Sequence, residues 1–280
     1  MVKDKDRKIE EKYNIETGYF DDGLPYARIG NKSEILIDIE ALSFTNRPPS
    51  GMTLKQFAKS AQLFTDQFTY YLVGRKPNLP EGYLFDKMAE DYAQLIRKEF
   101  KKPVIIMGTS TGGQIAQYLA ADHPDVVKNL IIISAAYRLS EKGIEVEGKS
   151  AEYFQQGKYG KSLSTIIDLM FKSRILKALM KPFLRLLGKK FMGDIEYPND
   201  FLNEVRGDRE MNFADRLKHI KAPTLILSGE KDIAYTAEDV KKTAEGIPNA
   251  KLIMYEKFGH NLVMRNRKQV VEDILEFLTA

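Results

Sequence analysis

A serine flanked by glycines is the most informative short motif in the chain. Gly108-Thr109-Ser110-Thr111-Gly112 follows the short apolar run Val104 to Met107 and precedes a stretch with helical patterning. A serine on a sharp turn between a strand and a helix exposes its hydroxyl, and glycines beside it avoid backbone collisions. The helix start also offers a free N–H, that of Thr111, to a developing oxyanion. The motif therefore predicts that Ser110 is a nucleophile.

A serine hydroxyl needs a base, and the chain has three histidines that could supply one. His123 follows a predicted helix and is expected to cap its end, and His219 is expected to be a surface or packing residue. His260 comes just after the apolar run Leu252 to Tyr255. Loops at the carboxyl ends of parallel strands are where such sheets build their sites. We therefore predict that His260 is the base.

The acid that orients the base is expected between the serine and the histidine in the chain. Asp232 fits this order and follows the apolar run Thr224 to Leu227. Glu230 on the same turn is its nearest competitor, and the loop after the preceding strand offers no carboxylate before Glu141. The sequence thus predicts a Ser110, His260 and Asp232 triad, which requires no metal or organic cofactor.

The elements that must position these residues alternate along the chain. Two N-terminal runs, 13–20 and 26–29, predict an antiparallel hairpin. Further strands are expected at 33–39, 68–73, 104–107, 130–134, 224–227 and 252–255, and helices at 53–64, 83–100, 114–121, 237–244 and 268–278. This alternation predicts an α/β fold with a parallel sheet covered on both faces. Only helical patterning occurs between strands 130–134 and 224–227, so we predict a core of residues 1–136 and 222–280 and a helical cap insertion at 137–221.

These segments resemble the α/β-hydrolase family over nearly the whole chain. The resemblance is carried by Met88 to Asp91, Lys102 to Gly113, His123 to Leu130, Ile220 to Asp232, and Gly259-His260. It implies a mostly parallel, eight-stranded sheet and a cap over the pocket. Family members that open epoxides or displace halide carry aspartate at the elbow, so the serine points to the esterase, lipase, thioesterase, peroxidase-like and C–C hydrolase branches.

The chain departs from the family at the loop expected after the third strand. His-Gly is frequent there, whereas this chain has Glu40-Ala41-Leu42-Ser43. The resemblance implies the N–H of Leu42 as the second oxyanion donor beside Thr111. Ala41 has less backbone freedom than glycine, and Glu40 would bring a negative charge near the oxyanion unless it points away. The expected function is hydrolysis of a carboxylic ester or related acyl compound through an acyl-enzyme. The alternatives are an acyltransferase or C–C hydrolase on the same triad, and a non-catalytic relative that binds a ligand or partner.

Composition limits the remaining possibilities. The chain has 280 residues, of which 43% are hydrophobic and 29% charged, as expected for a large soluble domain. The first ten residues lack the apolar segment of a secretory signal, so we expect a cytoplasmic protein. Cysteine is absent, which excludes disulfides and thiolate metal ligands. The net charge of +4 is too small to predict nucleic-acid binding. The expected partner is a small acyl substrate, and the sequence does not predict the oligomeric state.

The cap insertion contains a basic segment. Between Lys158 and Met192 the chain has nine of its 43 basic residues and one of its 39 acidic residues, so this segment carries +8 and the rest −4. Pro182 is predicted to start a second helix there. Apolar residues recur every three or four positions, and Arg174, Lys177, Lys181 and Arg185 fall on other faces; the apolar set is Leu176, Leu179, Met180, Phe183, Leu184, Leu187 and Phe191. We expect the apolar face to cover the pocket while the lysines are solvated. A lid that meets acyl chains or an anionic membrane surface, and a dimer contact, are the alternatives.

Overall fold

The computed structural model describes residues 2–279, and the side chains of Val2, Lys3 and Phe191 lie outside this description. Its centre is an eight-stranded sheet of β1 (Ile15–Tyr19), β2 (Pro25–Ile29), β3 (Ile35–Ile39), β4 (Thr69–Val73), β5 (Val104–Thr109), β6 (Val127–Ile133), β7 (Thr224–Gly229) and β8 (Ala250–Tyr255). The strands lie in the order β1-β2-β4-β3-β5-β6-β7-β8. Strand β2 pairs antiparallel with β1 and β4, and every other pairing is parallel. The expected mostly parallel sheet is confirmed.

Helices cover both faces of the sheet because successive side chains of a strand point to opposite faces. One face packs against α3 (Phe85–Leu95), α4 (Thr111–Asp122) and α9 (Ala237–Gly246), and it presents side chains such as Ile106, Leu130 and Ile132. The other face packs against α2 (Gly51–Ala61) and α10 (Leu262–Thr279), with Ile105 and Ile131 among its core residues. Strands buried on both faces explain the nearly continuous apolar runs of β5, β6 and β7.

Short helical segments complete the core. A π-helical turn, η1 (Ile96–Phe100), extends α3, and a 3₁₀ turn, η2 (Pro124–Val126), follows α4. Helix α1 (Val2–Tyr13), which the sequence analysis did not predict, joins α2 through a hydrogen bond from the Gly51 N–H to Asp6 Oδ1 of 2.8 Å. Within residues 2–279 no helix combines the length and the apolar character that crossing a bilayer requires.

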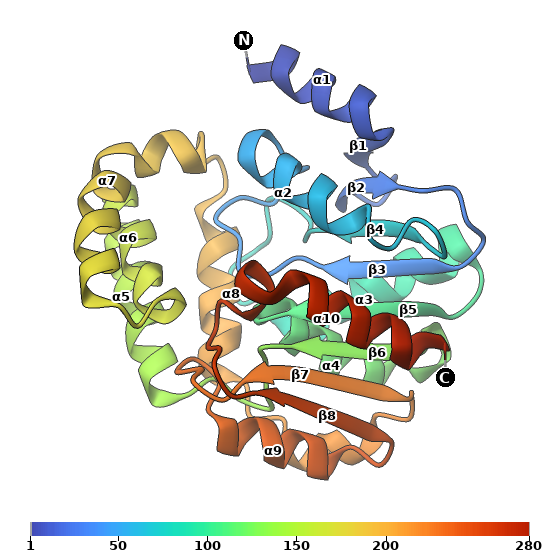
Figure 1. Cartoon of the computed structure of the whole chain (residues 1–280). Coiled ribbons are helices and arrows are strands. Elements are labelled where there is room, and N and C mark those ends of the chain that lie inside the picture. Colours follow the sequence, from blue (N-terminus) through green and yellow to red (C-terminus); the bar gives the residue numbers. More distant parts are fainter. Residues whose placement is uncertain (1, 280) are drawn as a thin grey trace.

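Four helices stand between β6 and β7 in the chain, within the segment predicted as a cap. They are α5 (Glu141–Gln155), α6 (Tyr159–Met170), α7 (Arg174–Met192) and α8 (Pro198–Glu210), and a 3₁₀ segment, η3 (Ala214–His219), leads into β7. Figure 1 shows α5, α6 and α7 beyond the carboxyl ends of the parallel strands, with α8 between them and the sheet. These helices therefore lie at the edge of the sheet where the sequence predicts the site.

The prediction that Pro182 starts a second helix is wrong, because α7 continues through it as one helix. Pro182 lies on the exposed side of α7, where water can solvate the carbonyl that loses its bond. Packing against α6 fixes the helix on both sides of the proline. A Cβ added to Gly188 would lie 2.6 Å from the Cα of Gly160, so the two backbones nearly touch there.

The expectation that the apolar face of α7 covers the pocket is also wrong. Helix α7 packs on α6 rather than on the core, so Leu179 and Phe183 are 70% and 54% exposed, and Leu176 is exposed as well. Met180, Leu184 and Leu187 are half-buried, and the side chain of Phe191 lies outside the described residues. Lys177 and Lys181, expected in solvent, pair with Asp168 of α6 at 3.3 and 2.6 Å.

Candidate active site

The turn between β5 and α4 holds Ser110 in a conformation that few residues adopt. Its φ of 56° and ψ of −127° lie outside the common regions for a residue with a side chain. A Cβ on Gly108 would lie 2.3 Å from the Gly112 oxygen, and one on Gly112 would lie 2.1 Å from the Ile39 oxygen. Both flanking positions therefore require glycine, and the tight packing presses the start of α4 against the end of β3.

The structure brings Ser110, His260 and Asp232 together. Ser110 Oγ lies 3.1 Å from His260 Nε2, and His260 Nδ1 lies 2.9 Å from Asp232 Oδ2. The other carboxylate oxygen of Asp232 accepts the N–H groups of Ala234 and Tyr235 at 2.8 and 3.2 Å. Since these backbone bonds fix the carboxylate, it can in turn fix the orientation of the imidazole.

Two loops meet to place the acid next to the base. The loop after β7 donates the Lys231 N–H to the Phe258 carbonyl of the loop after β8, at 2.9 Å. A Cβ on Gly229 would lie 2.4 Å from the same carbonyl oxygen, so this approach also depends on a glycine. The contact fixes Asp232 and His260 relative to each other although they come from different strands.

Burial and charge act in opposite directions on the base. The His260 side chain is 8% exposed and that of Asp232 is fully buried. Burial lowers the pKa of His260, but the Asp232 carboxylate, its hydrogen bond and the more distant Asp208 together raise it above the ordinary value. The site therefore stabilises the imidazolium that forms when the histidine accepts a proton.

The two backbone N–H groups predicted to bind an oxyanion are those of Thr111 and Leu42. Within residues 2–279, no hydrogen bond uses the N–H of Thr111 at the start of α4 or that of Leu42 in loop 40–43. The contact between Gly112 and the end of β3 brings this loop next to the elbow. The loop therefore begins next to the elbow, and the role of Leu42 as second oxyanion donor stays a prediction.

Glu40 was expected to bring a negative charge near the oxyanion unless its side chain points away. A Cβ on Gly74 would lie 3.0 Å from Glu40 Oε2, so the carboxyl group lies against the end of β4. Burial raises the pKa of Glu40 to about 7, although Arg75 counteracts this effect. Much of the negative charge is consequently absent near neutral pH.

Arg75, which was not predicted as a site residue, holds loop 40–43 from behind. Its guanidinium is 1% exposed and donates to the carbonyl oxygens of Glu40 and Ala41, the latter at 3.0 Å. It also forms a two-pronged ion pair with Glu204 of α8, with Nε to Oε1 at 3.0 Å. Glu204 accepts the Ser43 N–H at 3.1 Å. The position of Arg75 just after a buried strand could have indicated a role at the site. Glu204 lies in a helix with many charged residues, so its position in the sequence gives no such indication.

A second buried group that the sequence did not indicate lies behind the elbow. The Thr111 hydroxyl donates to Asp208 Oδ2 at 2.7 Å, and Asp208 interacts with Glu147 of α5. Burial raises the pKa of Asp208 to about 8 and that of Glu147 well above its ordinary value. The charge and hydrogen bond of Asp208 raise the pKa of Glu147 further, whereas the hydrogen bonds from Thr111 and Glu147 lower that of Asp208. The pair therefore retains a proton near neutral pH and limits the negative charge beneath the nucleophile.

The other candidate residues lie outside the site. His123 ends α4, and its Nε2 lies 3.1 Å from Glu90 Oε2. His219 and Glu230 are exposed. Neither histidine replaces His260, and Glu230 does not replace Asp232 as its partner.

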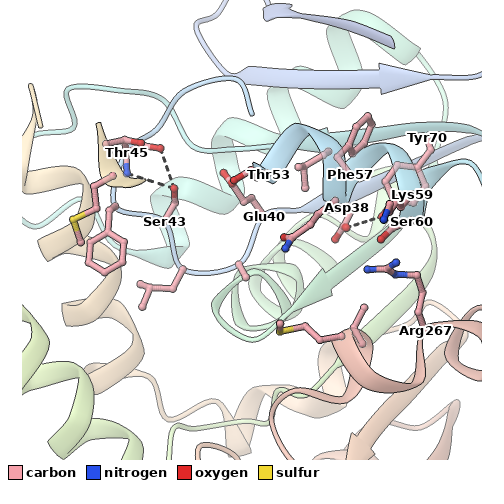
Figure 2. A pocket seen from close by; sticks show the side chains of 18 of the residues that line it. Asp38, Glu40, Ser43, Thr45, Thr53, Phe57, Lys59, Ser60, Tyr70 and Arg267 are labelled. Atoms are coloured by element: carbon pink, nitrogen blue, oxygen red, sulfur yellow. Dashed lines mark hydrogen bonds between the residues drawn. The ribbon is translucent and has the colours of Figure 1, made fainter. Parts of the chain in front are cut away.

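A cavity of about 690 Å³ opens beside loop 40–43. Leu42 lines it together with Met192 at the end of α7 and Met264 of α10, but Ser110 and His260 do not. Figure 2 shows Asp38 and Glu40 directed into this cavity, with the Tyr70 hydroxyl bonded to Asp38 Oδ2 at 2.6 Å. The cavity thus lies between loop 40–43, the end of α7 and α10.

Comparison with known proteins identifies the family. A family model described as alpha/beta hydrolase fold matches residues 65–266. The chain is 28% identical over 219 residues to the bifunctional esterase/perhydrolase of Acinetobacter calcoaceticus, covering 74% of this chain and 78% of that protein. It is 25% identical over 235 residues to the pimeloyl-[acyl-carrier protein] methyl ester esterase of Chromobacterium violaceum, covering 79% and 88%. An alpha/beta hydrolase from a Medee basin deep-sea metagenome library shares the fold, with a TM-score of 0.78 and 16% identity over 95% of this chain and 98% of that one. The chain belongs to the α/β-hydrolase fold family and is an α/β-hydrolase enzyme.

Proposed function

We propose that this enzyme hydrolyses carboxylic esters or related acyl compounds through an acyl-enzyme on Ser110. The observation that carries the proposal is the continuous path from Ser110 Oγ to His260 Nε2 at 3.1 Å and from His260 Nδ1 to Asp232 Oδ2 at 2.9 Å. A serine with this arrangement is activated as a nucleophile. The relatives named as esterases support the same chemical class.

In the first half of the reaction, His260 Nε2 takes the proton of Ser110 as Oγ attacks the acyl carbon. The carbonyl oxygen becomes an oxyanion and is stabilised by the N–H groups of Leu42 and Thr111. Asp232 stabilises the imidazolium while it lasts. The imidazolium then protonates the leaving oxygen, which departs as an alcohol and leaves the acyl group on Ser110.

The second half repeats these steps with water. His260 takes a proton from the water as it attacks the acyl carbon, and the same two N–H groups stabilise the second oxyanion. Ser110 Oγ then leaves and recovers its proton from His260. A carboxylic acid is released, and the enzyme returns to its starting state without a change of oxidation state.

A fluorophosphonate probe tests the proposal directly, because it reacts with serines that a base has activated. We expect labelling of the wild type and none of Ser110→Ala or His260→Ala. His219→Ala removes an exposed histidine and should leave labelling unchanged. A wild type that stays unlabelled while properly folded would show a non-catalytic relative.

Hydrolysis of p-nitrophenyl esters of graded chain length tests the acyl specificity of the same site. Asp232→Asn should lower kcat by about 10⁴-fold with little change in KM, because the amide no longer favours the correct tautomer or the imidazolium. Turnover at the wild-type rate in this variant would contradict the role assigned to the carboxylate.

A further inference from the structure

The outer side of α7 carries a stripe of large apolar residues. Ile175, Leu179, Phe183 and Leu186 are 77%, 70%, 54% and 82% exposed. Their spacing of three or four residues places them on one side of the helix. We call these four residues the α7 stripe. Figure 1 shows α7 at the outer edge of the cap, away from the sheet. An exposed apolar surface of this kind marks an interaction site.

Exposed cations accompany the stripe. Arg174, Arg185 and Lys189 fall along one flank of it, since a helix turns once every 3.6 residues. Lys172 precedes the helix and Lys190 lies near its end, and all five side chains are exposed. Among the described residues, no carboxylate forms an ion pair with any of the five.

The lysines on the inner side of α7, in contrast, have an acidic partner. Lys177 and Lys181 face α6 and share Asp168, with nitrogen to oxygen distances of 3.3 and 2.6 Å. The carboxylate of Asp168 therefore neutralises cations on the inner side of α7, whereas no carboxylate within residues 2–279 pairs with those beside the α7 stripe. The basic charge that distinguishes this segment is displayed next to its apolar surface.

We propose that the α7 stripe docks on an anionic lipid bilayer, with α7 lying in the plane of the interface. The four apolar side chains would enter the boundary between headgroups and acyl chains, while the flanking arginines and lysines bind anionic headgroups. An anionic bilayer binds helices that present apolar side chains and cations side by side, as α7 does. A contact with a second copy of α7 would bring like charges together, which disfavours that occupant.

Docking would also orient the candidate active site. Helix α7 ends at Met192, which lines the 690 Å³ cavity beside Leu42. The element that meets the lipid therefore contributes directly to the wall of this cavity. The proposal does not depend on the hydrolytic mechanism, because it concerns a surface that contains none of the proposed catalytic residues.

Vesicle cosedimentation with the full chain tests the proposal. We expect binding to vesicles of phosphatidylcholine mixed with phosphatidylglycerol, and little binding to phosphatidylcholine alone. In the assay, the salt concentration is raised from about 0.05 to about 0.5 M. Binding to the anionic vesicles should weaken over this range, because salt screens the attraction to the headgroups.

Two variants separate the contributions of charge and apolar surface. Arg185→Gln with Lys189→Gln should lower the partition coefficient about 25-fold, since each cation near an anionic surface contributes roughly a factor of five. Ile175→Ser with Leu186→Ser should lower it by at least about ten-fold. Lys218→Gln with Lys241→Gln makes the same charge change on exposed residues outside α7 and should have little effect.

The result that overturns the proposal is a wild type that fails to bind the anionic vesicles at low salt. Equal losses in the α7 charge variant and the Lys218 and Lys241 variant would also overturn it, because binding would then follow net charge alone. Light scattering tests the other possible occupant of the stripe, a second copy of the chain. If the wild type is a dimer that Ile175→Ser with Leu186→Ser converts to a monomer, and neither binds vesicles, the stripe is a contact between copies. Circular dichroism and turnover of a soluble ester show that each variant is folded.

Discussion

Replacing Arg75 with methionine is expected to reduce both stability and turnover, for two separable reasons. The guanidinium is 1% exposed, and its partner Glu204 is fully buried. Burial tends to lower the pKa of Arg75, but the carboxylate of Glu204 raises it above its ordinary value, so the arginine is charged. The same guanidinium holds the carbonyl oxygens of Glu40 and Ala41. The substitution therefore breaks an ion pair and releases loop 40–43.

The magnitudes follow from these two roles. Removing one partner of a buried ion pair typically costs about 3–5 kcal/mol in the free energy of unfolding. Releasing the loop displaces the N–H of Leu42, and loss of one oxyanion donor typically lowers kcat by about 10²–10³-fold. We expect Arg75→Met to fall in both ranges, with a small change in KM because the loop acts chiefly on the transition state.

A double variant separates folding from positioning. Arg75→Met with Glu204→Leu replaces both charges by apolar groups, which is often neutral for stability. We expect the free energy of unfolding to recover while kcat stays low, because the tether to Glu40 and Ala41 is still missing. Urea denaturation and p-nitrophenyl acetate hydrolysis at pH 8, where Glu204 is largely ionised, give the two quantities.

The control is Arg28→Met, which removes a partly exposed arginine paired with Glu16 at 2.9 Å. Its effect on stability should stay within about 1 kcal/mol, and kcat should not change. The reasoning is refuted if the double variant recovers kcat together with stability. Arg75 would then influence catalysis only through the fold.

Three further predictions concern the elbow and the buried titratable groups. Gly112→Ala should destabilise the fold by about 1–3 kcal/mol and abolish ester turnover, because its Cβ would lie 2.1 Å from a backbone oxygen at the end of β3; urea denaturation and kcat measure this, and a normal enzyme would contradict it. The kcat/KM of hydrolysis should fall as pH drops through the pKa of His260, which is raised above its ordinary value, since only the neutral imidazole accepts a proton; a pH profile with its acid limb below the ordinary histidine range would oppose this. Burial raises the pKa of Asp208 to about 8 and also that of Glu147, so between about pH 5 and 8 the folded chain holds protons that the unfolded chain has released. Tm should therefore fall as pH rises over this range, and Asp208→Asn should flatten the slope; an unchanged slope would show that other groups cause it.

The sequence by itself determined the order of the sheet strands along the chain and the identity of the candidate catalytic residues. Alternating apolar runs and helical segments specify the parallel sheet, because burial on both faces of a strand requires near-continuous apolar residues. The glycines around Ser110 indicate an elbow, because no other residue tolerates the backbone approach found there. These signals are local in the chain, so they can be interpreted without coordinates.

Only the tertiary structure decided which residues support the site and which side of α7 faces outward. Arg75 and Glu204 are 129 residues apart in the chain, and nothing in either local sequence indicates the other. The pattern of α7 identified an amphipathic helix, but periodicity does not say whether its apolar side meets the core or solvent. That choice depended on the contact with α6 at Gly160 and Gly188, where the absence of side chains lets two backbones approach. Long-range packing of this kind is a property of the folded chain as a whole, since it depends on the shapes of surfaces that form only after the elements have assembled.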